Sequence, residues 1–203
     1  MKRIGIFGGS FNPVHLGHTA LAAYICEQGL VDEVWLMVSP QNPLKRDLAL
    51  LDEQERLTMA RLAVAPYPKL QACDFEFALP RPSYTYHTLQ ALRTTYPDCE
   101  FNLIIGEDNW QCFDRWYRGD DIARETHIIV YPRGVEDARL RKDDKVRFST
   151  FNFKLSILEN PPLLPYSSTE IRQCIAAGQD ASHMLHPDVA QYIKQQQHYI
   201  QKR

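Results

Sequence analysis

A strand, a glycine turn and a pair of histidines follow one another at the start of this 203-residue chain. The apolar run 4–7 (Ile-Gly-Ile-Phe) is typical of a short buried strand, and Gly8 and Gly9 allow a sharp turn behind it. His15 and His18 then stand where a helical pattern begins. Such a junction gathers unpaired backbone N–H groups and the positive end of a helix dipole, which suits an anion such as phosphate. The junction therefore predicts a nucleotide site.

The two histidines alone leave other interpretations open. The motif lacks the G-x-G-x-x-G spacing of a dinucleotide fingerprint and the G-K-S/T of a P-loop. Ordinary capping or core histidines are about as common at a helix start as ligand-binding ones. A metal site is disfavoured, because no third ligand stands at a useful spacing from His15 and His18. Two features favour the anion site: Gly17 would let a ligand approach the backbone, and open α/β sheets bind ligands at the carboxyl ends of their strands.

The rest of the chain alternates strand and helix patterns. Short apolar runs predict buried strands, and the longer periodic runs between them predict helical crossovers. The predicted strands lie at about 4–7, 34–38, 70–77, 100–105 and 126–131, with strand pieces in 146–158, and the predicted helices at about 19–30, 52–65, 85–94, 167–177 and 187–197. This order predicts an α/β fold with a doubly wound, Rossmann-like parallel sheet and helices on both faces. We expect a single domain over 1–203, with a small C-terminal helical extension from about residue 166.

Composition narrows the environment of the chain. The net charge of −2 shows no basic excess that would argue for a nucleic-acid partner. No apolar stretch approaches the length of a membrane span, and the run behind the basic N-terminus is too short for a signal peptide. The five cysteines are scattered and lack C-x-x-C spacing, which favours reduced thiols and a cytoplasmic location over disulfides or a zinc site.

The opening junction and several later segments resemble the bacterial nicotinate-nucleotide adenylyltransferases, a family of the His-x-Gly-His nucleotidyltransferase superfamily. Residues 8–18, Gly-Gly-Ser-Phe-Asn-Pro-Val-His-Leu-Gly-His, are similar to the family signature. The later segments are the proline-rich loop from Ser39 to Lys45, Ser-Tyr-Thr-Tyr-His-Thr-Leu at 83–89, Gly106-Glu107-Asp108 followed by Trp116, Ser-Ser-Thr-Glu-Ile-Arg at 167–172, and Pro187-Asp188-Val189 with Tyr192-Ile193. They follow the family order along nearly the whole chain, so chance is a poor explanation.

The resemblance implies an adenylyl transfer. The 5′-phosphate of nicotinate mononucleotide would attack the α-phosphorus of ATP, giving deamido-NAD and pyrophosphate, with Mg²⁺ accompanying the ATP. His15 and His18 would contact the phosphates and the departing pyrophosphate, and Lys45 and Arg172 would be further catalytic cations. The remaining ATP-binding residues that it implies are Gly8, Gly9, Ser10, Phe11, Gly106, Asp108, Ser168 and Thr169. Such transfers depend on positioning and charge stabilisation more than on a protein nucleophile, and the motifs contain no evident Ser-His-Asp or Cys-His set.

The pyridine end of the substrate is the more discriminating part of the resemblance. The nicotinate mononucleotide ligands that it implies are Asn12, Lys45, Thr85, Trp116, Tyr117 and Arg133. Trp116 and Tyr117 offer an aromatic face on which the ring can stack, and Thr85 at a helix start offers backbone N–H groups to a carboxylate. This arrangement favours nicotinate over nicotinamide, because a carboxylate needs donors whereas an amide needs a donor and an acceptor.

Each of these residues also has an ordinary structural interpretation when it is considered alone. Trp116 is equally typical of core packing, Lys45 of a solvated surface and Gly106 of a turn. Arg172 would be an exposed residue behind an ordinary helix cap about as often as a phosphate ligand. The order of the motifs, rather than any one residue, favours the functional interpretation.

Three positions depart from the family pattern, and other functions remain to be separated. Tyr166 stands in place of a small aliphatic residue, Ser39 in place of Val-Pro or Pro, and Glu107 in place of Ala; they bear on pocket shape alone. The alternatives are an adenylyltransferase for nicotinamide mononucleotide or phosphopantetheine, and a non-catalytic nucleotide-binding module. We expect small-molecule partners, ATP and nicotinate mononucleotide, and neither nucleic acid nor membrane; a homo-oligomer stays open.

Overall fold

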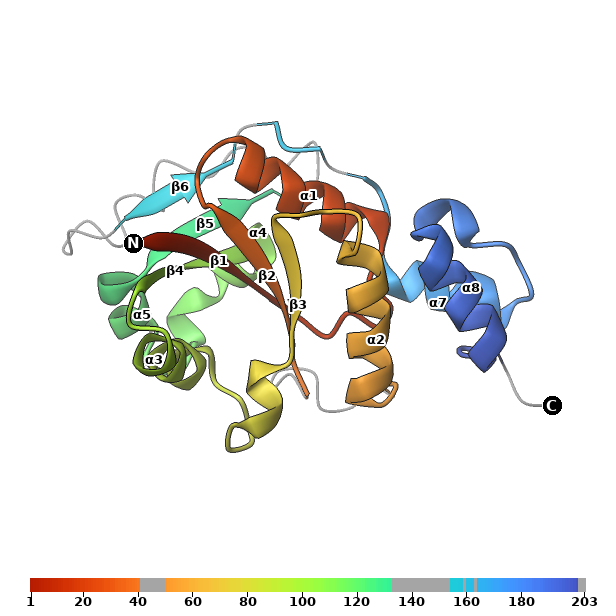
Figure 1. The fold of residues 1–203 in the computed structure, drawn as a ribbon, viewed down its shortest axis with the longest axis horizontal. Helices are drawn as coiled ribbons and strands as arrows, with labels where there is room; N and C mark the ends of the chain where they lie inside the picture. The colour runs from red at the N-terminus through yellow and green to blue at the C-terminus, as the bar shows by residue number, and fades with distance from the viewer. Residues whose placement is uncertain (41–49, 133–153, 159, 163, 201–203) are drawn as a thin grey trace.

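The structure is a computed structural model that describes residues 1–40, 50–132, 154–158, 160–162 and 164–200 (Figure 1). The strands are β1 (Lys2–Gly9), β2 (Glu33–Val38), β3 (Leu70–Cys73), β4 (Cys99–Gly106), β5 (His127–Tyr131) and β6 (Leu155–Ile157). The α-helices are α1 (Leu16–Glu27), α2 (Glu53–Val64), α3 (Thr85–Thr95), α4 (Glu107–Gln111), α5 (Gly119–Glu125), α7 (Ser168–Ala176) and α8 (Pro187–Gln196). Short 3₁₀ turns are η1 (Phe75–Ala78), η2 (Phe113–Arg115) and η3 (Ser182–Met184).

The six strands form one parallel sheet in the order β3-β2-β1-β4-β5-β6. The chain runs outward from β1 to β2 and β3, and then returns to add β4, β5 and β6 on the other side of β1. The strand order therefore changes direction between β1 and β4, which is the switch point where open α/β sheets bind ligands. This topology confirms the predicted doubly wound, Rossmann-like fold.

Two apolar cores lie on opposite faces of the sheet. Alternate residues of β2 show this directly: Leu36 belongs to the core under α1 and α2, whereas Trp35 and Met37 belong to the core under α3 and α5. Successive side chains of a strand point to opposite faces, so a strand that is apolar at every position must be covered on both. All five residues from Val34 to Val38 are buried, as that arrangement requires.

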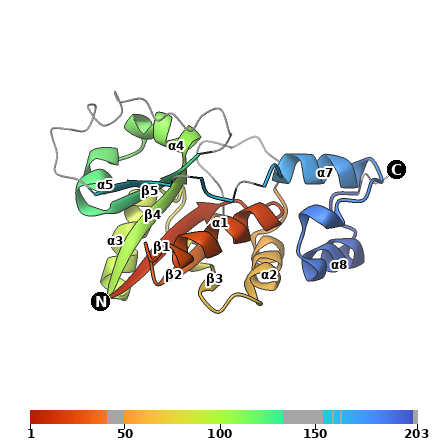
Figure 2. The same cartoon turned by 90° about the horizontal axis from the view of Figure 1, so that it is seen from above.

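The two C-terminal helices lie beyond α2, on the side away from α3 and α5 (Figures 1 and 2). Val189 and Ile193 of α8 and Ile171 of α7 join the core that α1 and α2 cover. The Tyr192 hydroxyl donates a 2.7 Å hydrogen bond to the Glu55 carboxylate and so connects α8 to α2. Within the described residues, no helix combines the length and the apolar character needed to cross a bilayer.

The chain differs from the predicted elements after Cys73. The predicted strand 70–77 is wrong in its second half, since β3 ends at Cys73 and η1 follows. Phe75 and Phe77 alternate as in a strand, but the chain forms η1 here, and the buried Glu76 between them accepts a hydrogen bond from Thr88 of α3. Helices α4 and α5 were not predicted. Of the predicted strand pieces in 146–158, β6 is described, and 146–153 lie outside the described residues.

Candidate active site

A cavity of about 460 Å³ opens at the carboxyl ends of β1 and β4, beside the switch point of the sheet. Four segments that are distant in the sequence surround it: the turn after β1, the start of α3, the chain from the end of β4 to Tyr117, and the start of α7. The predicted site residues that line it are Gly8, Gly9, Ser10, Phe11, His15, His18, Thr85, Gly106, Asp108, Trp116, Tyr117, Ser168, Thr169 and Arg172. Asn12 is not among the lining residues, and Lys45 and Arg133 lie outside the described residues.

His15 and His18 stand together at the mouth of α1. Their rings are stacked, with centroids 3.7 Å apart. The backbone N–H of His15 donates to Nδ1 of His18 at 3.2 Å, so a neutral His18 carries its proton on Nε2. No acidic side chain occupies the first turn of α1, so no residue of this turn neutralises the positive end of the helix dipole.

Gly17 and Phe11 give this turn its shape. A Cβ on Gly17 would lie 3.0 Å from Nδ1 of His15, so any larger residue would crowd the His15 ring and displace it by a few tenths of an ångström. Gly17 itself lines the cavity, and the expectation that it lets a ligand approach the backbone stays a prediction. Phe11 adopts a φ of +46°, in the left-handed region, which is energetically unfavourable for any residue other than glycine. Its buried ring holds it there, packed edge-on against Phe7 and His18.

The start of α7 meets the turn after β1. Ser168 Oγ donates to the Pro13 carbonyl at 2.8 Å, across 155 positions of sequence. Arg172 donates from Nη1 to the Asn12 carbonyl at 2.7 Å and from Nη2 to Thr169 Oγ1 at 3.2 Å. A half-buried cation and a helix N-terminus are thereby brought to the same cavity as the histidine pair.

Asn12 links these parts from inside the fold. It is 2% exposed, and its side-chain oxygen accepts hydrogen bonds from the Tyr199 hydroxyl at 2.8 Å and from the Leu51 N–H at 3.4 Å. Its carbonyl accepts the Arg172 bond. The geometry gives Asn12 a supporting place behind the turn, and it does not favour the predicted contact with nicotinate mononucleotide.

The opposite end of the cavity is aromatic. Trp116 packs against Phe113 with ring centroids 5.2 Å apart, and its buried Nε1–H has no hydrogen-bond partner among the described residues. Tyr117 is 48% exposed, and its ring lies 4.9 Å from that of Tyr84. Thr85 is the first residue of α3, and no acidic side chain occupies the first turn of that helix. This end therefore offers flat apolar surfaces beside the donor end of a helix.

Two buried charged residues near the cavity escaped the sequence analysis. Glu76 is 6% exposed, and its Oε1 accepts a 2.8 Å hydrogen bond from Thr88. Burial raises the pKa of Glu76 more than its hydrogen bonds to Thr88 and Ser39 lower it. Arg56 is 1% exposed and shares the buried face of α2 with Met59, three positions on. That register is a signal in the sequence, whereas the single Glu76 between Phe75 and Phe77 gives none.

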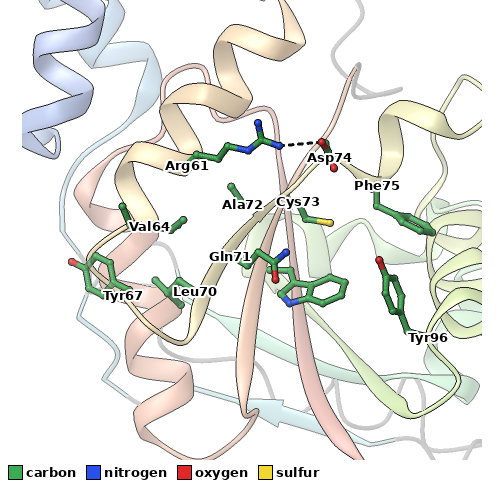
Figure 3. Close-up of a pocket in the computed structure, with 12 residues that line it drawn as sticks. Arg61, Val64, Tyr67, Leu70, Gln71, Ala72, Cys73, Asp74, Phe75 and Tyr96 are labelled. Atoms are coloured by element: carbon green, nitrogen blue, oxygen red, sulfur yellow. Dashed lines mark hydrogen bonds and ion pairs between the residues drawn. The ribbon is translucent and has the colours of Figure 1, made fainter.

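A second hollow of about 460 Å³ lies along β3 at the edge of the sheet (Figure 3). Arg61 points toward Asp74 at its rim, with 3.2 Å between the charged atoms, so this cation is already neutralised. Burial raises the pKa of Cys73 to about 11, which keeps its thiol protonated and unreactive at neutral pH. Nothing in this hollow is suited to phosphate chemistry. Among the described residues, no group of three or more His, Cys, Asp and Glu side chains could hold a metal ion.

Comparison with known proteins finds a matching family and similar proteins. The family described as cytidylyltransferase-like matches residues 6–174. A probable nicotinate-nucleotide adenylyltransferase of Bacteroides thetaiotaomicron is 47% identical over 194 residues, which cover 95% of this chain and 91% of the relative. Its counterpart in Bacteroides fragilis is 46% identical over 197 residues, covering 96% and 92%.

Solved structures show the same fold. The nicotinic acid mononucleotide adenylyltransferase of Plasmodium falciparum, complexed with NaAD, superposes with a TM-score of 0.80 at 21% identity, over 98% of both chains. A second solved structure, of a Vibrio parahaemolyticus protein assigned to the nicotinate-nucleotide adenylyltransferases, superposes with a TM-score of 0.71 at 24% identity. The match covers 100% of this chain and 98% of the other. From the fold, the motifs and the near-complete match to the Bacteroides relatives, this chain belongs to the nicotinate-nucleotide adenylyltransferase family.

Proposed function

We propose that this protein transfers the AMP group of ATP to nicotinate mononucleotide, giving deamido-NAD and pyrophosphate. The observation that carries the proposal is a single cavity with two chemically different ends. One end has stacked histidines, a helix N-terminus and an arginine, and the other has aromatic faces beside a second helix N-terminus. The Bacteroides relatives carry the corresponding name, and the Plasmodium falciparum protein was solved with NaAD.

At the phosphate end, the work is positioning and charge stabilisation. An oxygen of the nicotinate mononucleotide phosphate forms a bond to the α-phosphorus of ATP, and the bond from that phosphorus to the bridging oxygen of the pyrophosphate breaks. The electrons of the broken bond stay with pyrophosphate, whose growing negative charge needs donors in place. We assign this role to the Nε2–H of His18, to His15 and to Arg172, with the N–H groups of α1 behind them.

Magnesium enters this scheme with the nucleotide. The described residues contain no carboxylate or imidazole cluster that could bind the ion by itself, so we assign it to the triphosphate of ATP. When bound there, it would supply further charge neutralisation. Lys45, which the sequence predicts as an additional cation, stays a prediction outside the described residues.

At the aromatic end, we assign Trp116 to stacking on the pyridine ring and the first N–H groups of α3, at Thr85, to the nicotinate carboxylate. The unpaired Trp116 Nε1–H supports a polar ligand at this end, because a buried donor without a partner costs about 1–3 kcal/mol until a ligand satisfies it. Arg133, predicted to lie near a substrate phosphate, falls outside the described residues. We place the reaction in the cytoplasm, in keeping with five cysteines that are all free thiols.

The test is a measurement of pyrophosphate release with ATP and magnesium, using nicotinate mononucleotide in one series and nicotinamide mononucleotide in the other. We expect kcat/KM to be higher for nicotinate mononucleotide, because the α3 N-terminus supplies donors and no matching acceptor. A preference for nicotinamide mononucleotide would move the protein to the alternative substrate. Binding of ATP without pyrophosphate release in either series would leave the non-catalytic module as the explanation.

A further inference from the structure

The last described residues of the chain return to the turn that precedes the histidines. Helix α8 ends at Gln196, and two residues beyond it, Gln197 and Tyr199, adopt left-handed φ values of +54 and +63. Such φ values are energetically unfavourable for residues other than glycine, and they persist where surrounding contacts stabilise them. Here the contacts are a hydrogen bond between His198 and Glu55, at 2.8 Å, and the bond from the Tyr199 hydroxyl to Asn12, also at 2.8 Å.

Asn12 connects Tyr199 to the candidate active site through two hydrogen bonds. The Tyr199 hydroxyl holds the side-chain oxygen of Asn12, and the carbonyl of the same residue holds Nη1 of Arg172. Burial raises the pKa of the Tyr199 hydroxyl, which therefore stays protonated and can donate this bond throughout the neutral range. Tyr199 itself does not line the cavity.

We propose that Tyr199 is a positioning residue for the adenylyl transfer: its hydroxyl fixes the orientation of Asn12, and the Asn12 carbonyl in turn aims Arg172 at the phosphates. This inference rests on the proposed function, because it takes Arg172 to be a phosphate ligand. It gives Tyr199, which follows α8, an indirect role in the reaction through its hydrogen bond to Asn12. Among the described residues, the hydrogen bonds of Asn12 do not extend to Thr85 or Trp116 at the pyridine end of the cavity.

Tyr192→Phe is a matched control for Tyr199→Phe. Each variant removes one hydroxyl that donates one short hydrogen bond between the C-terminal region and the body of the protein. The Tyr192 hydroxyl reaches Glu55 of α2 and does not touch the turn at Asn12. A merely structural role would make the two variants alike in stability and in turnover.

We expect Tyr199→Phe to lower kcat about tenfold and to raise the ATP Kd several-fold, with KM for nicotinate mononucleotide unchanged. Tyr192→Phe should leave all three at the values of the parent protein, and both variants should melt within a few degrees of each other. An unchanged kcat and ATP Kd in Tyr199→Phe would overturn the inference. So would equal losses in both variants.

A double variant tests the route through Arg172. If Tyr199 acts by aiming that guanidinium, then adding Tyr199→Phe to Arg172→Ala should change the ATP Kd by less than twofold, because the group being aimed is already gone. A full additional loss in the double variant would overturn the route. The ATP Kd, measured by calorimetry, needs no turnover, so a parent protein that binds ATP but releases no pyrophosphate would refute the proposed function while this measurement still decides the role of Tyr199.

Discussion

Replacing Arg56 by methionine should destabilise the protein strongly. Among the described residues, Arg56 forms no ion pair with a carboxylate, and the expected loss comes from its hydrogen bonds to backbone carbonyls. The guanidinium is almost completely buried and donates to four backbone carbonyls: Nε to Leu51 at 2.9 Å, Nη1 to Ser10 at 2.7 Å and Ser39 at 2.8 Å, and Nη2 to Pro40 at 3.0 Å. These carbonyls belong to the turn after β1, to the residues that follow β2 and to the residue before the cap of α2. One side chain therefore holds three segments together at the carboxyl ends of the strands, where the cavity opens.

The magnitude follows from two opposing contributions. Each hydrogen bond from a charged donor is worth about 1.5–3 kcal/mol, and each buried carbonyl left unpaired costs about 1–3 kcal/mol. Against this, methionine removes a buried charge whose desolvation costs several kcal/mol. We therefore expect a net loss of about 3–5 kcal/mol, the range found when one partner of a buried charged group is removed. At about 2–4 °C per kcal/mol for a chain of this size, Tm should fall by on the order of 10 °C.

Thermal and urea unfolding of Arg56→Met measure this loss, and Arg61→Met on the same helix is the matched control. The Arg61 side chain is 58% exposed, and its ion pair with Asp74 is solvated, so the control should lose about 0–1 kcal/mol. Arg56→Lys keeps the charge but gathers its donors on one nitrogen, and its Tm should lie between those of the parent and of Arg56→Met. Equal Tm values for Arg56→Met and Arg61→Met would refute the reasoning.

Three further predictions concern turnover, pH and thiol chemistry. His18→Ala should lower kcat by about 10²–10³-fold with little change in Tm, and an unchanged rate would remove His18 from the site. Because folding raises the pKa of Glu76 above its usual 4.5, the stability that this group contributes is complete below pH 4.5 and is lost as the pH rises through the raised value. Urea unfolding across this range should therefore show Glu76→Gln gaining stability relative to the parent as the pH increases, and a constant difference would contradict the assignment. Burial raises the pKa of Cys26 and of Cys73 to about 11, so alkylation by iodoacetamide at neutral pH should leave both unmodified until urea unfolds the chain; rapid labelling of the folded protein would be the contrary result.

Local patterns were enough to predict most of the sheet and half of the site. Apolar runs of strand length and helical runs between them predicted β1, β2, β4 and β5, because burial on both faces requires side chains that are apolar at every position. The junction from β1 to α1 is continuous in sequence, so local pattern alone assigns Gly8, His15 and His18 to one anion site, and all three line the cavity. The later motifs could be brought to that site through their resemblance to a known family.

The tertiary structure alone decided how the parts are held together. Ser168 and Arg172 bond to the carbonyls of Pro13 and Asn12 across more than 150 positions, and Tyr199 reaches Asn12 across 187. Hydrogen bonds to backbone carbonyls leave no trace in the sequence around the acceptor, because every residue carries a carbonyl. For this reason the sequence did not indicate the supporting place of Asn12 or the backbone contacts of Arg56. The sequence predicted which groups bind the nucleotide, and the folded chain determined which buried groups keep those residues in place.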